Sequence, residues 1–384
     1  MGKYTYEDLK IMRSWPLQKK IQVSQTRIIE WLQHYNDKVY ISFSGGKDST
    51  VLIDLVRRIN PDITAVFVDT GLEYPEIKDF VRCFENVQWL RPQKYDNKTK
   101  KHTYFPFSEV ILEYGYPILS KEVASSIESY RSAKTEKQKD RYMNGDKYKH
   151  YKIPLKWRYL IDEDIKISAR CCDVMKKQPI HRFTEQTGLV GIVGMLAEES
   201  RLRESHWLQY GCNAFDKSYP TSNPLSFWTN QDILQYLALF EDSIMQRIKS
   251  QRFLTEENQQ YIDKLIHPWA SVYGDIIEQD GEYVTTGLSR SGCMFCLFGI
   301  HLEDEPNRIQ KMKLSHPKQY EFCINETRAW DLDTGEEWEF IDDDGKEMSH
   351  AEIEDICKAY KNDLKIKHGL GLGKVLDLIH VNYK

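Results

Sequence analysis

Short apolar runs alternate with helical patterns in the first part of the chain. Residues 38–43 form a β-rich run, residues 50–59 carry apolar side chains at helical spacing, and residues 63–68 form a second apolar run. Nearly continuous apolar runs are typical of strands that are buried on both faces of a parallel sheet. A third run at 189–195 repeats the pattern. The sequence therefore predicts a Rossmann-like α/β fold, in which helices flank a parallel sheet.

The rest of the chain predicts three regions. Residues 1–24 are expected to form an N-terminal helical segment, and residues 25–240 the α/β domain. A polar, aromatic-rich insertion is expected at about 91–165, and residues 241–384 are expected to form a separate C-terminal region with an acidic tail. Smaller elements are expected at 233–239 (helix), 338–341 (β-like) and near 375–379 (closing helix).

Composition indicates an ordinary globular protein. Of 384 residues, 41% are hydrophobic and 29% are charged, which is a usual mixture for soluble domains. The longest apolar stretch with little charge, 188–197, is much shorter than the ~20 residues of a membrane-spanning helix. The first six residues do not lead into the apolar core of a signal peptide. We therefore expect a cytoplasmic protein without a membrane span.

Charge is distributed unevenly. The net charge is −5, yet residues 91–158 hold sixteen Lys and Arg against eight Asp and Glu, whereas residues 321–363 hold four against fifteen. Two interpretations stay open: two solvated faces that balance each other, or a basic segment that binds a polyanion such as nucleic acid. Aromatic residues interleave the basic segment: Tyr95, Tyr104, Phe105, Phe107, Tyr142, Tyr148, Tyr151 and Trp157.

A glycine-rich segment connects the first predicted strand to the first predicted helix. It consists of Ser44, Gly45, Gly46, Lys47, Asp48 and Ser49. Backbone N–H groups at the start of a helix bind anions, and glycine allows the main chain to approach them closely. A carboxylate beside a polyphosphate is repelled unless a cation such as Mg²⁺ lies between them, so Asp48 predicts Mg²⁺. The alternative is a glycine-rich turn with an incidental charge pair.

This segment resembles the SGGKDS loop of the PP-loop ATP pyrophosphatases and sulfonucleotide reductases. Three further segments occur in the order of the phosphoadenosine-phosphosulfate-reductase-like branch. Residues 69–76 resemble its DTG-x-x-(F/Y)-PE segment, residues 194–203 its G-x-R-x-x-ES-x-x-R segment, and residues 224–233 its PL-x-x-W-x-x-x-D-(V/I) segment. The resemblance implies a Rossmann-like fold that holds the phosphate end of ATP, or of a related adenine nucleotide, at the loop.

The resemblance also implies site residues. The nucleotide would be bound by the 44–49 loop together with Asp69, Thr70, Gly71, Glu199 and Ser200. Lys47, Asp48 and Arg203 would be catalytic, with Mg²⁺ bound through Asp48. Because ligands of open parallel sheets lie outside the carboxyl ends of the strands, we expect these segments to converge there.

Two groups stand out among the eight cysteines: Cys171 with Cys172, and Cys293 with Cys296. Four thiolates suit either zinc or an iron–sulfur cluster, and inert buried thiols are the alternative. The two groups resemble the CC and GC-x-x-C segments of the assimilatory adenylyl-sulfate reductases, which implies a [4Fe–4S] cluster. Cys323 is a reserve ligand or a sulfur carrier. The other thiols are expected in the core or on the surface: Cys83, Cys212 and Cys357.

One departure from the reductases decides the expected activity. Their nucleophilic cysteine lies in a C-terminal E-C-G-(I/L)-H tail, and residues 369–384 contain no cysteine. The chain fits better the cluster-bearing relatives that use ATP to activate an oxygen for sulfur insertion, such as the DNA-phosphorothioation pyrophosphatase and thiolation enzymes. Expected partners are then nucleic acid, through residues 91–158, and a sulfur donor such as a cysteine desulfurase. The alternatives are a true thioredoxin-dependent sulfonucleotide reductase and a non-catalytic sensor or assembly subunit.

Overall fold

The computed structural model describes residues 2–146, 151–252, 255–265, 270–342, 348 and 350–384. The chain divides into two compact units, and each unit is built from two separate stretches of sequence. Unit 1 comprises Met1–Gln93 and Lys176–Gly292, and unit 2 comprises Lys94–Met175 and Cys293–Lys384. The chain therefore passes between the units three times.

These units differ from the three expected regions. Nearly all of the expected insertion at 91–165 lies in unit 2, but residues 241–292 belong to unit 1 and not to a separate C-terminal region. The reason lies in two long helices. Helix α2 (Leu17–Tyr35) continues across the expected boundary at residue 24, and helix α10 (Asn230–Lys249) continues across the expected boundary at residue 240.

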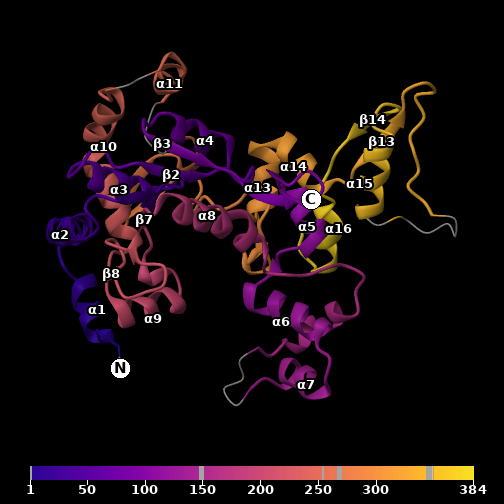
Figure 1. Ribbon diagram of the computed structural model, residues 1–384, viewed down its shortest axis with the longest axis horizontal. Helices are drawn as coiled ribbons and strands as arrows, with labels where there is room; N and C mark the ends of the chain where they lie inside the picture. The colour runs from indigo at the N-terminus through magenta and orange to yellow at the C-terminus, as the bar shows by residue number, and fades with distance from the viewer. Residues whose placement is uncertain (1, 147–150, 253–254, 266–269, 343–347, 349) are drawn as a thin grey trace. The chain divides into compact units, whose positions relative to one another are not determined.

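Unit 1 contains the predicted α/β sheet. Its strand order is β3-β2-β1-β7-β9-β8, and all neighbours are parallel except β8, which runs antiparallel to β9. Strands β2, β3, β7 and β8 are labelled in Figure 1. Ile41 in the middle of β1 lies opposite Ala65 on one side and Ile192 on the other. The strands are Val39–Ser42 (β1), Ala65–Val68 (β2), Val87–Leu90 (β3), Val190–Val193 (β7), Asn213–Ala214 (β8) and Thr221–Ser222 (β9).

Helices pack on this sheet and on one another. Helix α3 contacts β1, α2 and α10, and nearly all of its residues are accordingly buried. Helix α8 packs on the sheet through Phe183, which contacts Tyr40 and Val66. Besides α2 and α10, the helices of unit 1 are Tyr6–Arg13 (α1), Lys47–Arg57 (α3), Pro75–Arg82 (α4), Gln178–Thr187 (α8), Ala197–Glu199 (η3, 3₁₀), Arg201–Tyr210 (α9), Glu256–Ile262 (α11) and Ala270–Tyr273 (α12).

The 224–233 segment has a structural role in unit 1. The Trp228 indole donates a hydrogen bond to the Ser24 hydroxyl (2.9 Å), which in turn donates to the Pro224 carbonyl (2.8 Å). The Lys20 ammonium is buried and donates to the Asp232 carboxylate at 2.5 Å. These contacts join α2 to the start of α10, so this segment stabilises the frame of the site.

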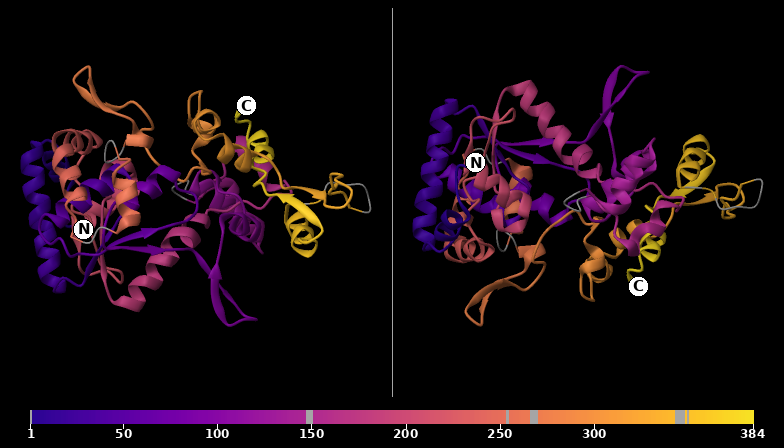
Figure 2. Two further views of the ribbon diagram at one scale, coloured as in Figure 1. Left: turned by 90° about the horizontal axis from the view of Figure 1, so that it is seen from above. Right: turned by 90° about the horizontal axis from the view of Figure 1, so that it is seen from below.

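A hairpin projects from unit 1 (Figure 2). Its strands are Ile276–Gln279 (β10) and Glu282–Thr285 (β11), which pair antiparallel. The pairing continues below the strands, where the Gly287 N–H donates to the Tyr273 carbonyl at 2.8 Å. Residues 270–292 are called the arm below.

Unit 2 is an assembly of short elements. The expected closing helix is present as α16, whereas the β-like stretch expected at 338–341 is not a strand. Trp338 and Phe340 instead pack on a small core that contains Cys357 and Leu364. The strands are Gln93–Asp96 (β4), Lys101–Tyr104 (β5), Ile118–Leu119 (β6), Leu297–Phe298 (β12), Arg328–Asp331 (β13) and Leu364–Lys367 (β14). The helices are Phe107–Tyr114 (α5), Lys121–Ser132 (α6), Glu136–Asn144 (α7), Leu155–Ile161 (η1, 3₁₀), Asp173–Lys177 (η2, π), Ile300–Leu302 (η4, 3₁₀), Arg308–Ser315 (α13), Pro317–Ile324 (α14), His350–Ala359 (α15) and Leu372–Leu378 (α16).

Among the helices in the described ranges, none combines the length and the apolar character needed to cross a bilayer.

Candidate functional site

The 44–49 loop connects the end of β1 to the first turn of α3. Gly45 has a φ of +71°, and a Cβ at this position would lie 2.7 Å from Cγ2 of Ile77 and 2.9 Å from Cγ2 of Val81. Only glycine therefore fits between the loop and α4. Gly46 caps α3 with an extended backbone and no side chain. Helix α3 therefore begins directly at the loop, and anion sites are commonly found at such helix N-termini.

The two serines of the loop hold its shape. The Ser49 hydroxyl donates to the Gly46 carbonyl (2.8 Å) and accepts from the Ser44 N–H (3.2 Å). The Ser44 hydroxyl accepts from the Gly46 N–H at 3.4 Å. These bonds fix the backbone that would surround a phosphate group.

Lys47 and Asp48 form a buried charge pair. Lys47 is only 5% exposed, and its Nζ atom lies 3.7 Å from Oδ1 of Asp48. Burial lowers the pKa of the Lys47 ammonium, and the Asp48 carboxylate partly opposes this shift. Burial likewise raises the pKa of Asp48 against the attraction of Lys47, Arg290 and Arg203. Oδ1 of Asp48 is buried and accepts no hydrogen bond from the described residues. A carboxylate oxygen in this state suits a divalent cation.

Two arginines face this pair from the segment after β7 and from the arm. Glu199 forms an ion pair with Arg203, and its Oε1 atom lies 3.6 Å from Nη1 of Arg290. Burial lowers the pKa of Arg203, and the neighbouring Arg290 lowers it further. Ser200 caps α9 by accepting from the Arg203 N–H at 3.3 Å. The predicted convergence of the 44–49 and 199–203 segments is therefore seen in the structure.

The structure explains why the 194–203 segment begins with a glycine, Gly194. A Cβ at this position would lie 3.1 Å from the carbonyl oxygen of Asp48. The end of β7 therefore packs directly against the first turn of α3. A larger residue would push these segments apart.

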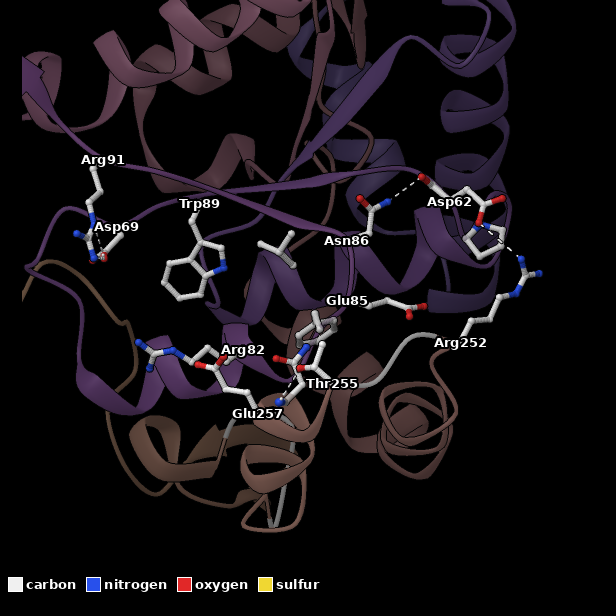
Figure 3. Close-up of a pocket in the computed structure, with 14 residues that line it drawn as sticks. Asp62, Asp69, Arg82, Glu85, Asn86, Trp89, Arg91, Arg252, Thr255 and Glu257 are labelled. Atoms are coloured by element: carbon white, nitrogen blue, oxygen red, sulfur yellow. Dashed lines mark hydrogen bonds and ion pairs between the residues drawn. The ribbon is translucent and has the colours of Figure 1, made fainter. Parts of the chain in front are cut away.

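The segment after β2 makes contacts of a different kind. Asp69 is buried and pairs with Lys78 (2.9 Å) and Arg91 (3.2 Å), and it accepts from the Gly71 N–H at 3.2 Å. Asp69 and Arg91 lie at one end of a cavity of about 820 Å³ that follows β3 (Figure 3). The Thr70 hydroxyl donates to Glu73 at 2.7 Å. The Asp69 carboxylate thus shapes the turn after β2, and it lines a different cavity from the 44–49 loop.

A smaller cavity of about 170 Å³ adjoins the loop. It lies at the carboxyl ends of β1 and β2, between α4 and α8, which is where open parallel sheets bind ligands. Its walls are apolar and polar in nearly equal measure, so they offer an aromatic base both packing surfaces and hydrogen-bonding groups. The lining side chains include Phe43, Ser44, Val66, Phe67, Glu73, Ile77, Ile180 and Ser291.

The sequence did not reveal three residues of the arm that reach the loop. The Lys47 N–H donates to the Tyr273 hydroxyl (3.4 Å), and that hydroxyl is hydrogen-bonded to the Ser291 hydroxyl. Arg290 is the partner of Glu199 described above. Arg290 and Ser291 directly precede Gly292 and Cys293 of the cysteine motif. Arginine and serine are residue types that bind phosphate, so their presence here could have indicated a second role for this stretch. Tyr273 carries no comparable signal.

In unit 2 the two cysteine groups are adjacent in sequence to segments that pair with residues 116–119. The Tyr116 N–H and carbonyl pair with residues 166 and 168, and Cys171 follows three residues later. On its other side β6 pairs with β12, which Cys296 directly precedes. The Cys296 N–H donates to the Cys293 carbonyl at 3.1 Å, so this pair sits on a tight turn.

The ligand set of the expected cluster is not formed by these contacts alone. Within the described ranges, no three His, Cys, Asp or Glu side chains are grouped so that they could hold a metal ion. The cluster, like zinc, therefore stays a prediction. Cys323 is fully buried in α14, and burial raises its thiol pKa strongly, as expected of a core thiol. The same burial is found at Cys83, Cys212 and Cys357.

The aromatic residues of the basic segment do not share one environment. Tyr95 (52% exposed) and Tyr104 (46%) lie on the β4–β5 hairpin, together with exposed lysines. Phe105, Phe107 and Trp157 are buried in unit 2. The expected interleaved surface is therefore confined to part of the segment. Tyr148 belongs to residues 147–150, which lie outside the described residues.

Comparisons with known proteins match the part of the chain that contains the 44–49 loop. The model of the phosphoadenosine phosphosulfate reductase domain matches residues 38–109, which include the 44–49 loop and Asp69. An adenosine 5′-phosphosulfate reductase of Staphylococcus haemolyticus is 44% identical over 66 residues, or 17% of this chain and 27% of that protein. Adenosine 5′-phosphosulfate reductase 2 of Bacillus subtilis is 25% identical over 113 residues, or 26% of this chain and 48% of that protein.

One further relative matches a similarly short stretch, and one solved structure aligns with a low TM-score. An uncharacterized protein of Methanocaldococcus jannaschii is 38% identical over 68 residues, or 18% of this chain and 16% of that protein. The matched stretches thus span less than half the length of these relatives. The crystal structure of phosphoadenylyl-sulfate reductase from Candida auris, in a phosphate complex, aligns with 62% of this chain and 87% of that chain. Its sequence identity is 13% and its TM-score is 0.30.

Proposed function

We propose that this chain, a phosphoadenosine-phosphosulfate-reductase-like member of the PP-loop proteins, binds Mg²⁺–ATP in unit 1 and releases pyrophosphate while activating an acceptor. The observation that carries the proposal is the Oδ1 atom of Asp48. It is buried without a hydrogen-bond donor at the start of α3, and Lys47, Arg203 and Arg290 surround it. Mg²⁺ would neutralise this carboxylate and bridge it to phosphate oxygens.

The reaction would be an adenylyl transfer. An acceptor oxygen forms a bond to the α-phosphorus, and the bond from that phosphorus to the bridging oxygen of the β-phosphate breaks. Pyrophosphate leaves with the electron pair, and the proton of the acceptor passes to water. The chemistry requires positioning and charge stabilisation more than covalent participation of the protein.

The described side chains have complementary roles in this proposal. The N–H groups of the loop and the Lys47 ammonium bind the β- and γ-phosphates, and the lowered pKa of Lys47 rises again beside the polyanion. Arg203 neutralises charge that develops at the α-phosphate. The adenine base of the nucleotide lies in the 170 Å³ cavity beside Ser44.

Sulfur transfer would complete the function. The outer sulfur of a persulfide (R–S–SH), carried by a donor protein such as a cysteine desulfurase, forms a bond to the activated atom of the acceptor, and AMP leaves with the electron pair of the broken bond to oxygen. A second thiol then attacks the inner sulfur, which releases the thiolated acceptor and leaves a disulfide. The acceptor class that we favour is nucleic acid, because the β4–β5 hairpin exposes tyrosines and lysines. No step of this proposal depends on an iron–sulfur cluster.

The second candidate is a sulfonucleotide reductase, which the names of the matched relatives favour. It predicts thioredoxin-dependent release of sulfite from adenylyl sulfate or phosphoadenylyl sulfate. It predicts no pyrophosphate from ATP. A sensor or assembly subunit predicts nucleotide binding with neither product.

Pyrophosphate release from Mg²⁺–ATP tests the proposal, with candidate acceptors added. Lys47→Met keeps the buried chain of Lys47 but removes its charge, and we expect a loss of roughly 100-fold or more. Lys249→Met, at the end of α10, is the matched control and should retain activity. Sulfite release without pyrophosphate would establish the second candidate instead.

A further inference from the structure

The arm reaches the phosphate loop with two hydroxyl groups. A Cβ placed on Gly46 would lie 3.2 Å from the Tyr273 hydroxyl and 3.3 Å from Oγ of Ser291. These hydroxyls therefore lie directly over the glycine where the loop offers its backbone to an anion. Tyr273 is only 2% exposed, so its position is set by packing and not by solvent.

Two glycines allow the arm to hold Tyr273 in this place. Gly274 has a φ of +66°, and a Cβ there would lie 2.3 Å from Oγ1 of Thr286. A Cβ on Gly287 would lie 2.6 Å from the Val272 carbonyl oxygen. The two sides of the arm thus approach more closely than side chains would permit. The position of Tyr273 is built into the arm.

A side-chain amide fastens the arm to the rest of unit 1. The Gln231 amide of α10 donates to the Tyr283 carbonyl (3.0 Å) and accepts from the Tyr283 N–H (2.8 Å). This pair of bonds imitates a strand contact. The arm is therefore held at both its base and its middle.

The Tyr273 and Ser291 hydroxyls carry one more proton than their shared hydrogen bond uses. The Tyr273 hydroxyl accepts from the Lys47 N–H and shares one hydrogen bond with Ser291. Two hydroxyls carry two protons, and their shared bond uses one of them. The other has no acceptor among the described residues. Because donors in a chain polarise one another, this last proton is a strong donor for an anion.

Arg290 adds a cation next to these hydroxyls. Its Nη1 atom lies 3.6 Å from Glu199, and its charge acts on Lys47, Asp48 and Arg203. Its side chain is 63% exposed, so it can move onto a bound ligand. Guanidinium groups match phosphate oxygens in geometry.

We propose that Tyr273, Ser291 and Arg290 bind the terminal phosphates of the nucleotide, and that the arm thereby completes a site which the 44–49 loop begins. This inference rests on the proposed function and extends it to a segment outside the matched residues 38–109. The hydrogen-bonded pair of Tyr273 and Ser291 donates its remaining hydroxyl proton to a phosphate oxygen. Arg290 neutralises the departing pyrophosphate.

The test uses calorimetry on the full chain with two probes, inorganic tripolyphosphate and ATP, each with Mg²⁺. Tyr273→Phe removes one hydroxyl and keeps the buried ring, and a lost hydrogen bond to a charged group corresponds to about 10-fold weaker binding. Arg290→Gln should weaken both probes by at least as much. Tyr283→Phe removes the same atom from the same arm, and it should change neither affinity.

Each outcome decides the question. Unchanged or tighter binding in Tyr273→Phe would overturn the inference, because the hydroxyl would then merely block the loop. Absence of tripolyphosphate and ATP binding in the natural protein would overturn it as well. Binding of tripolyphosphate that depends on Tyr273, in a protein that releases no pyrophosphate from ATP, would support the inference while refuting the proposed function.

Discussion

Replacing Asp48 by asparagine should separate Mg²⁺ binding from nucleotide binding. The amide has the size of the carboxylate but lacks its charge. In the natural protein, Oδ1 of Asp48 has no hydrogen-bond donor and Nζ of Lys47 is 3.7 Å away. Leaving a buried acceptor unsatisfied costs about 1–3 kcal/mol. A cation that binds this oxygen removes the cost, so Mg²⁺ should tighten ATP binding about 5- to 150-fold more in the natural protein than in Asp48→Asn.

Calorimetry with a non-hydrolysable ATP analogue, with Mg²⁺ or with EDTA, measures this difference. Asp62→Asn is the matched control, because Asp62 is exposed and only loosely paired with Arg252 at 3.9 Å. It should keep the full response to Mg²⁺. An equal response in Asp48→Asn and in the natural protein would refute the assignment of Mg²⁺ to Asp48.

The same reasoning gives a pH dependence. Burial raises the pKa of Asp48 above its ordinary value of 3.8. The carboxylate therefore takes up its proton at a higher pH than an exposed aspartate does, and the protonated form does not bind Mg²⁺. The response to Mg²⁺ should be complete above the raised pKa and should decline as the pH falls through it. Asp48→Asn should show no such decline.

Three further predictions concern other parts of the chain. Gly46→Val would place a side chain against the Tyr273 hydroxyl, 3.2 Å from the Cβ position, and should abolish nucleotide binding by calorimetry without unfolding the protein. If the cysteines bind a cluster, anaerobically purified protein should contain iron and sulfide, and Cys171→Ala or Cys293→Ala should lose both, whereas a colourless protein with one zinc per chain would contradict the cluster. If the β4–β5 hairpin binds nucleic acid, changing its lysines to glutamate should reduce the salt slope of binding by roughly 0.7–0.9 for each lost phosphate contact, and absence of binding near physiological salt would leave a small-molecule acceptor. The lysines to change together are Lys98, Lys100 and Lys101.

The sheet could be predicted because its strands are buried on both faces. The apolar runs at 38–43, 63–68 and 189–195 correspond to β1, β2 and β7, and the loop between β1 and α3 has glycines that its geometry requires. The unit boundaries could not be predicted in this way. Helix α10 continues to Lys249 because buried side chains continue along it to Ile248. No local sequence signal marks residue 292 as the end of unit 1.

The site was predictable where function needs special backbone geometry. A Cβ on Gly45 would collide with α4 and a Cβ on Gly194 would be tight against the Asp48 carbonyl, and both glycines lie in recognisable motifs. The contribution of the arm was hidden, because an ordinary tyrosine gains its role only from the approach of Gly274 to Gly287. Asp69 directly follows β2, but it lines a different cavity from the 44–49 loop, and its ion-pair partners Lys78 and Arg91 lie outside the 69–76 motif.

The interrupted course of unit 1 affects how the chain emerges from the ribosome. Strand β1 lies between β2 and β7, but β3 ends at Leu90 and β7 begins only at Val190. At about 5–20 residues per second, roughly 5–20 s separate the synthesis of these strands. During this time β1 has an open edge with unpaired backbone groups, which is a template for aggregation. The nascent chain should therefore depend on chaperones more than a protein whose sheet is encoded without interruption.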